Sequence, residues 1–380
     1  MSNYEAFINE SAEKFKAILR EQLDREDRMA AEKNASAAEK ETITIGVVGG
    51  DGIGPLIVGE AEKVLNKLLK EEIESGKILI KNIEGLTIEN RLEKGKSIPE
   101  DVLSEIKSCD VLLKGPTTTP KGGSMESANV SLRRELDLYA NVRPVSVPEK
   151  NIDWIFFREN TEGEYALGSR GIELPEKIAV DFKVTTESGT LRIARSAFEY
   201  AKNNNMGRVS IVTKANIMKK TDGKFSALCH KVAEEYPEIE TDEWYIDIMA
   251  ANLVNENIRS SFKVFLLPNL YGDIITDEAA QIQGGVGTAG SANIGDKYAM
   301  FEAIHGSAPR MVEEGIANKA DPRSILKAAE MLLRHIGFIE KAEKLIKAIE
   351  KASEDKSVVP TGTKEGPNCT DFTNKLLEII

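Results

Sequence analysis

The sequence predicts an α/β fold, because apolar segments of strand length alternate with amphipathic segments of helix length. Residues 43–48 form a mostly apolar run that is typical of a strand buried on both faces. A glycine-rich turn at residues 49–55 joins this run to an amphipathic segment at residues 56–75, which predicts a helix. The alternation then continues along the chain and predicts a sheet with helices on both faces.

The elements after this first unit follow from the same apolar runs and helical periodicity. Strands are predicted at residues 78–83, 110–114, 152–158, 178–185, 208–213 and 262–267, and helices at residues 99–107, 189–203, 222–236 and 273–282. The chain is mostly helical from Pro322 to its end, and no internal repeat is present.

Residues 1–41 differ from the rest of the chain, because they contain no glycine or proline and many Glu, Lys and Ala residues. Their apolar residues recur at steps of three and four and predict one helical stripe, formed by Tyr4, Phe7, Ile8, Phe15, Ile18, Leu19 and Leu23. This stripe either packs on the protein's own body or forms an oligomer contact. Residues 30–41 are expected to form a linker.

Composition narrows the class of protein. A hydrophobic content of 41% with 29% charged residues is typical of a globular protein, and a net charge of −12 argues against a nucleic-acid partner. Three scattered cysteines indicate a reducing, cytoplasmic setting. We expect no membrane association, because no apolar run approaches the roughly 18 residues of a membrane-spanning helix.

Three arginines lie in apolar sequence that does not resemble a solvated basic patch: Arg133, Arg143 and Arg158. A buried guanidinium stays charged and requires an anionic partner. Three such groups together suggest a ligand with several carboxylates, each held by a planar fork. The alternative is that they pair internally with Glu135, Asp137 and Glu159.

Three aspartates suggest a divalent metal site. Asp273 and Asp277 are four residues apart where a helix is predicted to begin, so their carboxylates share one helix face. Oxygen ligands of this kind suit Mg²⁺ or Mn²⁺, although helix capping would explain them equally well. Asp247 lies between apolar residues, where an unpaired carboxylate is costly and cation binding would stabilise it.

Two further residues are candidates for proton transfer. Lys214 follows the strand predicted at residues 208–213, and acids and a metal near such a lysine can tune its pKa for proton transfer. Tyr165 is a candidate proton donor. The alternatives are an ordinary surface lysine and a buried tyrosine with one hydrogen bond.

Two glycine-rich regions are candidates for ligand contact. The glycines at positions 50, 52 and 54 depart from the spacing of a dinucleotide-binding turn, so we interpret them as a tight strand-to-helix connection. The glycines of residues 284–295 and the loop at residues 305–309 allow close backbone approach to a phosphate or a flat ring. His305 in that loop could stack on adenine.

Six motifs in this order resemble those of the β-decarboxylating dehydrogenases, a family that includes isocitrate, 3-isopropylmalate, homoisocitrate and tartrate dehydrogenases. They are GDGIGP (50–55), LRRELDLYANVRP (132–144), RENTEGEY (158–165), KANIM (214–218), NLYGDIITD (269–277) and HGSAP (305–309). The resemblance runs from about residue 42 to the end of the chain, and residues 1–41 lie outside it.

The resemblance implies a large and a smaller α/β domain with a dimer clasp. The large, cofactor-binding domain would comprise residues 42–137 and 284–380, and the small domain residues 138–283, with the clasp at 163–187. The resemblance also implies a homodimer with shared active sites, and a further oligomer contact through the N-terminal helical extension is left open.

The same resemblance implies roles for the candidate residues. Lys214 and Tyr165 would be the catalytic residues, with Lys214 and Asp247 contributed by the neighbouring subunit. Asp247, Asp273 and Asp277 would bind Mg²⁺ or Mn²⁺. Substrate would be bound by Ser127, Asn129, Arg133, Arg143 and Arg158. Cofactor would be bound by Thr119, His305, Gly306, Ser307, Ala308, Arg310 and Asn318.

Isocitrate is the expected substrate, because Ser127 and Asn129 offer hydrogen bonds where the isopropylmalate enzymes carry leucines. The expected reaction is oxidative decarboxylation to 2-oxoglutarate, a step of the tricarboxylic acid cycle. The alternatives are a 3-isopropylmalate or homoisocitrate dehydrogenase and a non-catalytic regulatory subunit of an isocitrate dehydrogenase. The presence of all the expected catalytic positions argues against the regulatory subunit.

Cofactor choice is where the sequence departs from the family pattern. After HGSAP, NAD-dependent members usually carry Asp and an aliphatic residue, whereas this chain carries Arg310 and Met311. An arginine there could bind a 2′-phosphate bidentately, which favours NADP. Glu313 and Glu314 lie close by, so NAD stays open.

Overall fold

The computed structural model describes residues 3–31, 40–120, 125–168 and 170–380. The chain divides into two compact units. Unit 1 comprises residues 1–36 and 157–274, and unit 2 comprises residues 37–156 and 275–380. The predicted domain boundaries at 137/138 and 283/284 stay a prediction. Among the described residues, no helix is both long and apolar enough to cross a membrane.

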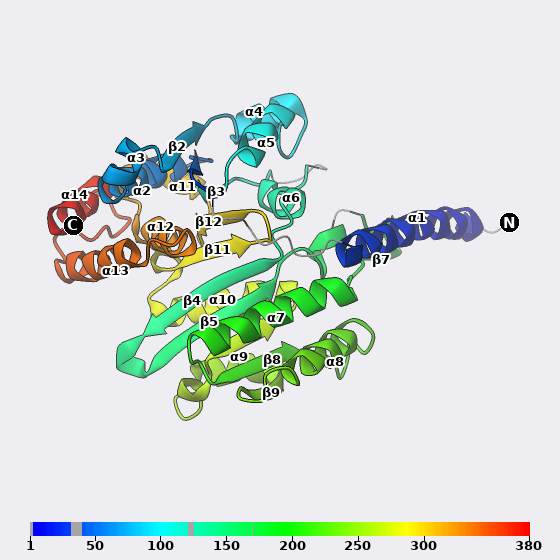
Figure 1. Ribbon diagram of the computed structural model, residues 1–380. Coiled ribbons are helices and arrows are strands. Elements are labelled where there is room, and N and C mark those ends of the chain that lie inside the picture. Colours follow the sequence, from blue (N-terminus) through cyan, green and yellow to red (C-terminus); the bar gives the residue numbers. More distant parts are fainter. Residues whose placement is uncertain (1–2, 32–39, 121–124, 169) are drawn as a thin grey trace. The chain divides into compact units, whose positions relative to one another are not determined.

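Unit 2 is built on a mixed sheet with the strand order β2-β1-β3-β12-β11-β4 (Figure 1). Its strands are β1 (Ile43–Val48), β2 (Ile78–Ile83), β3 (Val111–Lys114), β4 (Ala140–Val147), β11 (Gly290–Ile294) and β12 (Ala299–Ala303). Strands β2, β1, β3 and β12 run parallel, whereas β11 is antiparallel to both β12 and β4. The strand prediction for residues 43–48, 78–83 and 110–114 is confirmed.

Helices cover both faces of this sheet. Successive residues of each strand point to opposite faces and therefore contact different helices. On one face, Met300 of β12 packs with Leu132 and with apolar residues of the helix at 100–107. On the other face, the ring of Phe301 lies 5.5 Å from that of His335. The helices of unit 2 are α2 (Gly54–Leu68), α3 (Lys70–Glu74), α4 (Ile88–Lys94), α5 (Glu100–Lys107), α6 (Ala128–Glu135), α11 (Pro309–Glu313), α12 (Arg323–His335), α13 (Ile339–Glu354) and α14 (Cys369–Ile379).

The turn after β1 is a structural junction. Gly52 has φ +61°, and a Cβ atom there would lie 2.0 Å from the carbonyl oxygen of Ser307, so only glycine fits. The buried carboxylate of Asp51 accepts hydrogen bonds from the backbone N–H groups of Ile88 and Thr118, both at 2.7 Å. The turn therefore fastens three loops of unit 2 to one another.

Unit 1 contains the parallel strands β10 (Val264–Leu267), β8 (Arg208–Thr213) and β9 (Glu240–Tyr245) in that order. Its helices α7 (Glu187–Asn203) and α8 (Thr221–Ala233) pack on each other and on these strands, and α9 (Ile246–Val254) follows β9 directly. A two-stranded antiparallel hairpin is formed by β6 (Ile172–Leu174) and β7 (Ile178–Val180). Strand β7 is shorter than the strand predicted at 178–185.

Two elements run from one unit into the other: β5 (Ile152–Glu159) and α10 (Asn269–Gln283). Short 3-10 turns lie at Pro148–Lys150, Tyr165–Leu167, Arg259–Ser261, Val286–Thr288 and Ala317–Lys319.

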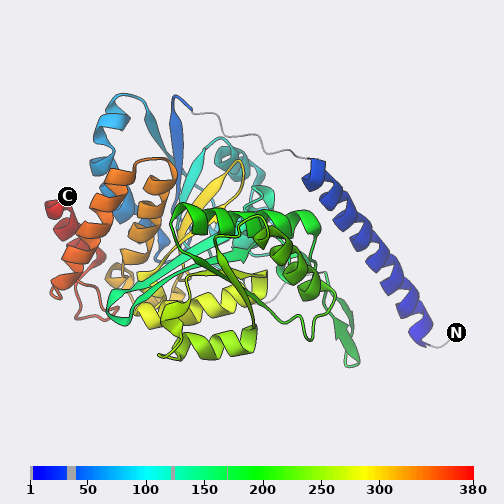
Figure 2. The same ribbon diagram turned by 60° about the horizontal axis from the view of Figure 1, so that its bottom comes forward.

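The predicted N-terminal helix is confirmed as α1 (Asn3–Ala31), a single unbroken helix (Figure 2). Within unit 1, the side chain of Ile18 is buried and the ring of Phe15 stacks on that of Phe182 at 5.5 Å. Tyr4, Ile8 and Leu23 stay exposed, so the apolar stripe is only partly covered. Residues 32–39 of the predicted linker lie outside the described residues.

We predict that Asp51→Ala destabilises the protein, because it removes the acceptor of the partly buried N–H groups of Ile88 and Thr118. A loss of about 2 kcal/mol corresponds to a fall in Tm of about 4–8 °C. Thermal unfolding measures this, with the exposed Asp153→Ala as control. Equal Tm values for the two variants would contradict the structural role of Asp51.

Candidate active site

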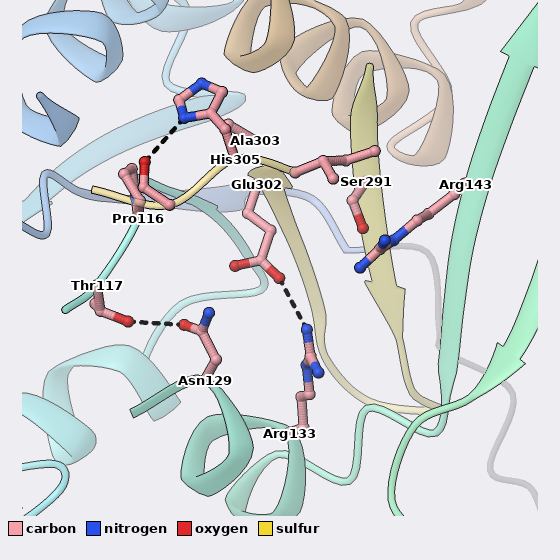
Figure 3. A pocket seen from close by; sticks show the side chains of 11 residues that line it. Pro116, Thr117, Asn129, Arg133, Arg143, Ser291, Glu302, Ala303 and His305 are labelled. Carbon is pink, nitrogen blue, oxygen red and sulfur yellow. Dashed lines mark hydrogen bonds and ion pairs between the residues drawn. The ribbon is translucent and has the colours of Figure 1, made fainter. Parts of the chain in front are cut away.

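A polar cavity of about 90 Å³ lies in unit 2 where β3 and β12 end (Figure 3). Its walls combine residues predicted to bind substrate with residues predicted to bind cofactor. The lining residues are Pro116, Thr117, Asn129, Arg133, Arg143, Ser291, Glu302, Ala303, Ile304, His305 and Gly306. The fold therefore brings five of the predicted site residues to one cavity, namely Asn129, Arg133, Arg143, His305 and Gly306.

The charge balance of this cavity depends on Glu302. Its carboxylate forms ion pairs with the fully buried Lys114 at 3.0 Å and with Arg133 at 3.5 Å. Burial raises the pKa of Glu302, but the charges of Lys114 and Arg133 outweigh this effect and lower the pKa to about 2. Glu302 is therefore ionised at neutral pH.

Arg133 keeps binding capacity beyond this ion pair. Its guanidinium has five N–H donors, and the bond to Glu302 is long and uses one nitrogen. The Nε atom is buried and has no hydrogen-bond partner among the described residues. A buried donor without a partner is costly, and an anion in the cavity would satisfy it.

Neither Lys114 nor Glu302 was anticipated from the sequence as part of the site. Lys114 is the last residue of β3 and Glu302 the last but one of β12, and the parallel register of the two strands pairs them. The signal available in the sequence was a charged residue at the carboxyl end of an otherwise apolar strand.

Arg143 lies on β4, with its side chain only 7% exposed. Its guanidinium donates to the hydroxyl of Thr276 at 2.6 Å and to Asp277 at 3.3 Å. Asp277 itself is mostly exposed, so the pair is open to solvent on the carboxylate side. The arginines thus form ion pairs within the protein, as the alternative interpretation expected. Glu302 for Arg133 and Asp277 for Arg143 were not among the acids expected from the sequence.

In unit 1, three predicted site residues converge on the first turns of α10. The carboxylate of Asp273 forms an ion pair with Arg158 through one oxygen and accepts a hydrogen bond from the Tyr165 hydroxyl, at 2.6 Å, through the other. Arg158 also donates from Nε and an Nη atom to Asn269 at 2.9 and 2.7 Å. Asp273 is thus positioned by both a cation and a phenol.

The predicted catalytic lysine has a carboxylate partner in the same unit. Lys214 forms an ion pair with Asp247, and this hydrogen bond is the main reason that the pKa of Asp247 is lowered. We expected apolar surroundings for Asp247, and this is wrong for the single chain, because the Asp247 side chain is 60% exposed to solvent. The reason is that β9 ends at Tyr245, which places Asp247 in the exposed first turn of α9.

The backbone at Lys214 is fixed by a buried ion pair. Its N–H donates at 2.8 Å to Asp222, whose carboxylate is fully buried and lies 2.5 Å from the Nζ atom of Lys183. Lys183 also pairs with Glu164 at 3.2 Å. The start of the KANIM segment is therefore tied to the residue preceding Tyr165 through Lys183.

The aspartates expected to bind a metal do not form a complete ligand set in one chain. Asp273 and Asp277 are one helical turn apart on α10, as predicted. Across the described ranges, no group of three or more His, Cys, Asp or Glu side chains could hold a metal ion. The two α10 carboxylates suit a hard cation by their chemistry, but further ligands are required.

The loop after β12 is fastened to the loop after β3 and contains one residue in the left-handed backbone region. Ser307 is buried and its hydroxyl lies 2.7 Å from that of Thr118, while Ala308 has φ +46°. Space is open at Gly306, where a Cβ atom would meet no other atom within 4 Å. These features allow a flat ligand to approach the backbone at His305 and Gly306.

The remaining predicted residues lie outside the cavity lining. Arg310 is exposed and donates to Glu314 at 2.7 Å, and Asn318 donates to Asn368 at 2.9 Å. Thr119 is exposed on the loop after β3, and Ser127 precedes the first residue of α6 without forming a side-chain cap.

Comparison with known proteins identifies the family. The isocitrate/isopropylmalate dehydrogenase family model matches residues 44–376. A probable mitochondrial NAD isocitrate dehydrogenase α subunit of Drosophila melanogaster is 36% identical, over 91% of this chain and 89% of that protein. The homoisocitrate dehydrogenase of Methanocaldococcus jannaschii is 38% identical, over 83% and 91%. The NADP isocitrate dehydrogenase of Rickettsia prowazekii is 40% identical, over 82% of this chain and 63% of that protein.

A solved structure is similar over the same region. The crystal structure of isocitrate dehydrogenase from Methylococcus capsulatus has a TM-score of 0.78 and 34% identity, and the match covers 89% of this chain and 99% of that one. The family resemblance and the fold class expected from the motifs are thereby confirmed. The chain belongs to the isocitrate/isopropylmalate dehydrogenase family of oxidative decarboxylating dehydrogenases.

Proposed function

We propose that this protein is an isocitrate dehydrogenase, which converts isocitrate to 2-oxoglutarate and CO₂ with reduction of a nicotinamide nucleotide. The observation that carries this proposal is the buried guanidinium of Arg133, whose Nε atom has no partner among the described residues. Arg143 and Asn129 line the same cavity. The amide oxygen of Asn129 accepts from the Thr117 hydroxyl at 2.9 Å, which leaves its N–H₂ group to donate to a ligand. Two cations and this donor favour a polycarboxylate over a substrate with an aliphatic branch, which would offer the donor no acceptor.

The residues have distinct roles in this proposal. Arg133, Arg143 and Arg158 bind substrate carboxylates, and Ser127 and Asn129 donate hydrogen bonds to the third carboxylate. Lys214, in its neutral amine form and oriented by Asp247, takes the proton of the substrate hydroxyl. Tyr165 returns a proton to carbon after decarboxylation.

Members of this family use a divalent metal and NAD or NADP. When bound, the metal would lower the pKa of the substrate hydroxyl and the nicotinamide would accept hydride. In our proposal Asp273 and Asp277 hold the Mg²⁺ or Mn²⁺ ion together with Asp247 of a second subunit. A ligand from a second subunit would supply what the described residues of one chain lack.

For the nucleotide we favour NADP. Thr119, His305, Gly306, Ser307, Ala308 and Asn318 would contact the cofactor. The exposed Arg310 would exchange its bond to Glu314 for one to a 2′-phosphate, since a phosphate is the stronger partner. NAD is the alternative, because Glu314 competes for the same guanidinium. The ratio of kcat/KM with NADP⁺ and NAD⁺ measures this preference.

A second candidate substrate is homoisocitrate, which the Methanocaldococcus jannaschii relative is named for. It also carries three carboxylates, so the arginines alone do not exclude it. 3-Isopropylmalate fits less well, because its aliphatic branch would face Asn129. A non-catalytic subunit is disfavoured by the hydrogen-bonded pairs Lys214–Asp247 and Tyr165–Asp273.

Assembly as a homodimer with shared active sites completes the proposal. The two segments that carry Lys214 and Asp247 expose a set of large apolar side chains: Ile217, Met218, Tyr245, Ile248 and Val254. Exposed apolar residues grouped in this way are typical of a surface that another protein covers. A second copy of the chain would cover them and bring its own carboxylates toward Lys214.

We predict that Arg133→Ala lowers kcat/KM for isocitrate by about 10- to 150-fold, which corresponds to about 1.5–3 kcal/mol for a charge-assisted hydrogen bond. The matched control is Arg134→Ala, because Arg134 is the next residue of α6 but is exposed and pairs with Glu126. Initial-rate kinetics measure both variants. Equal kcat/KM values for the two would remove Arg133 from the substrate site.

We predict that Ile248→Glu converts the dimer to monomers and abolishes turnover, because it places a charge in the proposed contact surface. Leu92→Glu is the control, since Leu92 on α4 of unit 2 is 56% exposed and Ile248 is 48% exposed. Light scattering measures the mass of each variant. An unchanged dimer in Ile248→Glu would exclude this surface as the dimer contact.

Deleting residues 1–31 tests for a contact beyond the dimer. Loss of species larger than a dimer in this variant would identify α1 as an additional contact.

A further inference from the structure

Helix α1 lies outside the family match at residues 44–376, yet it bonds to the segment that carries Arg158 and Tyr165. The guanidinium of Arg25 donates to Glu162 at 2.9 Å and to the hydroxyl of Thr161 at 3.1 Å. Arg25 is 20% exposed and Glu162 is 3% exposed, so this ion pair is shielded from solvent. Shielded pairs are screened little and respond strongly to loss of one partner.

Glu162, the ion-pair partner of Arg25, is one of two neighbouring buried carboxylates, and the other is Glu159. Glu159 accepts from the Thr161 N–H and hydroxyl and from the Glu162 N–H, at 2.7–2.9 Å. Glu162 accepts from the N–H and hydroxyl of Thr186. Burial, and secondarily the neighbouring charge of Glu162, raises the pKa of Glu159 to about 7.

The cations and hydroxyls facing these carboxylates come from three segments. Arg25 comes from α1, and Arg192 of α7 donates to the Thr161 hydroxyl at 3.1 Å. The hydroxyls are those of Thr161 and Thr186. Arg25 forms the ion pair with Glu162, so removing it leaves a buried negative charge without that partner.

The backbone of this segment connects directly to the Arg158 site. The Glu162 carbonyl accepts from the amide of Asn269 at 2.9 Å, and the amide oxygen of Asn269 accepts both bonds from Arg158. The next residue, Gly163, pairs with Val184 through both backbone groups. A shift of Glu162 would therefore displace Asn269 and, through it, Arg158.

Helix α1 is anchored at more than one point, so Arg25 has a defined position. The adjacent Glu26 accepts from the N–H and hydroxyl of Ser188, both at 3.0 Å, in the first turn of α7. Burial raises the pKa of Glu26, but these hydrogen bonds outweigh it and the pKa is lowered overall. Closer to the N-terminus of α1, Glu21 pairs with Arg170 at 2.7 Å.

We propose that α1 is a positioning element of the active site, in which Arg25 supplies the countercharge that holds Glu162 and thereby orients the segment from Arg158 to Tyr165. The part of this inference that concerns turnover rests on the proposed function. The part that concerns the order of the segment does not. Helix α1 (Asn3–Ala31) thus contributes to the geometry of a site formed by sequence 136–137 residues away.

The test compares Arg25→Met, Arg25→Lys and, as a matched control, Arg28→Met, an exposed arginine one turn further along α1. Arg25→Met is expected to lower kcat/KM for isocitrate about tenfold, with Arg25→Lys retaining most of the activity. Arg28→Met is expected to match the unaltered protein. The defect of Arg25→Met should be larger at pH 8.5 than at pH 6, since protonating one carboxylate relieves the repulsion.

A double-mutant cycle separates positioning from general destabilisation. In the Glu162→Gln background the further change Arg25→Met is expected to have little effect, because the charge it balances is gone. Hydrogen exchange of residues 158–165 gives a readout that requires no substrate, and Arg25→Met is expected to raise it at least about threefold.

Equal exchange and equal kcat/KM in Arg25→Met and Arg28→Met would overturn the proposal. Faster exchange with unchanged kcat/KM would overturn the positioning role as well. Absence of isocitrate turnover in the unaltered protein would refute the proposed function, while the exchange comparison would still decide whether Arg25 orders the segment.

Discussion

Glu302 holds one negative charge between the buried cations of Lys114 and Arg133, and the polar cavity of unit 2 is organised around it. Its pKa of about 2 shows that the two cations outweigh the cost of its burial. Arg143 adds a further cation to the same cavity, with its partner Asp277 on the solvent side. The cavity thus retains positive charge, and the Nε atom of Arg133 has no partner among the described residues. An anionic ligand with several carboxylates would neutralise this charge.

The sheet explains why these charges meet. Strands β3 and β12 are parallel, and their register places Lys114 beside Glu302 near the carboxyl ends of both strands. Alternation along each strand turns Lys114 and Glu302 to the face covered by α6, which carries Arg133. The glycine turn after β1 and the Asp51 carboxylate fix the neighbouring loops. The contacts that stabilise the loops and the charged groups of the cavity therefore lie at the same edge of the sheet.

Local sequence was sufficient to predict much of the fold. Apolar runs at 43–48 and 208–213 are strands whose side chains are mostly buried, and the run at 78–83 is an edge strand that pairs with β1. The spacing of Asp273 and Asp277 corresponds to one turn of α10. The prediction failed where the outcome depends on distant partners. The pairing of Lys114 with Glu302 depends on a register between segments far apart in sequence, and the exposure of Asp247 depends on where β9 ends. The sequence also contained no indication of the ion pair between Arg25 and Glu162, because these residues meet only through the packing of α1 within unit 1.

We propose that the polar cavity of unit 2 recognises a tricarboxylate rather than a dicarboxylate with an aliphatic branch. The most direct measurement is an initial-rate comparison with Mn²⁺, in which isocitrate and 3-isopropylmalate are each assayed with NADP⁺ and NAD⁺. The account predicts a kcat/KM for isocitrate that is at least about 100-fold higher with either nucleotide, since buried polar groups reject a substrate that leaves them unpaired. Equal values, or a preference for 3-isopropylmalate, would contradict it.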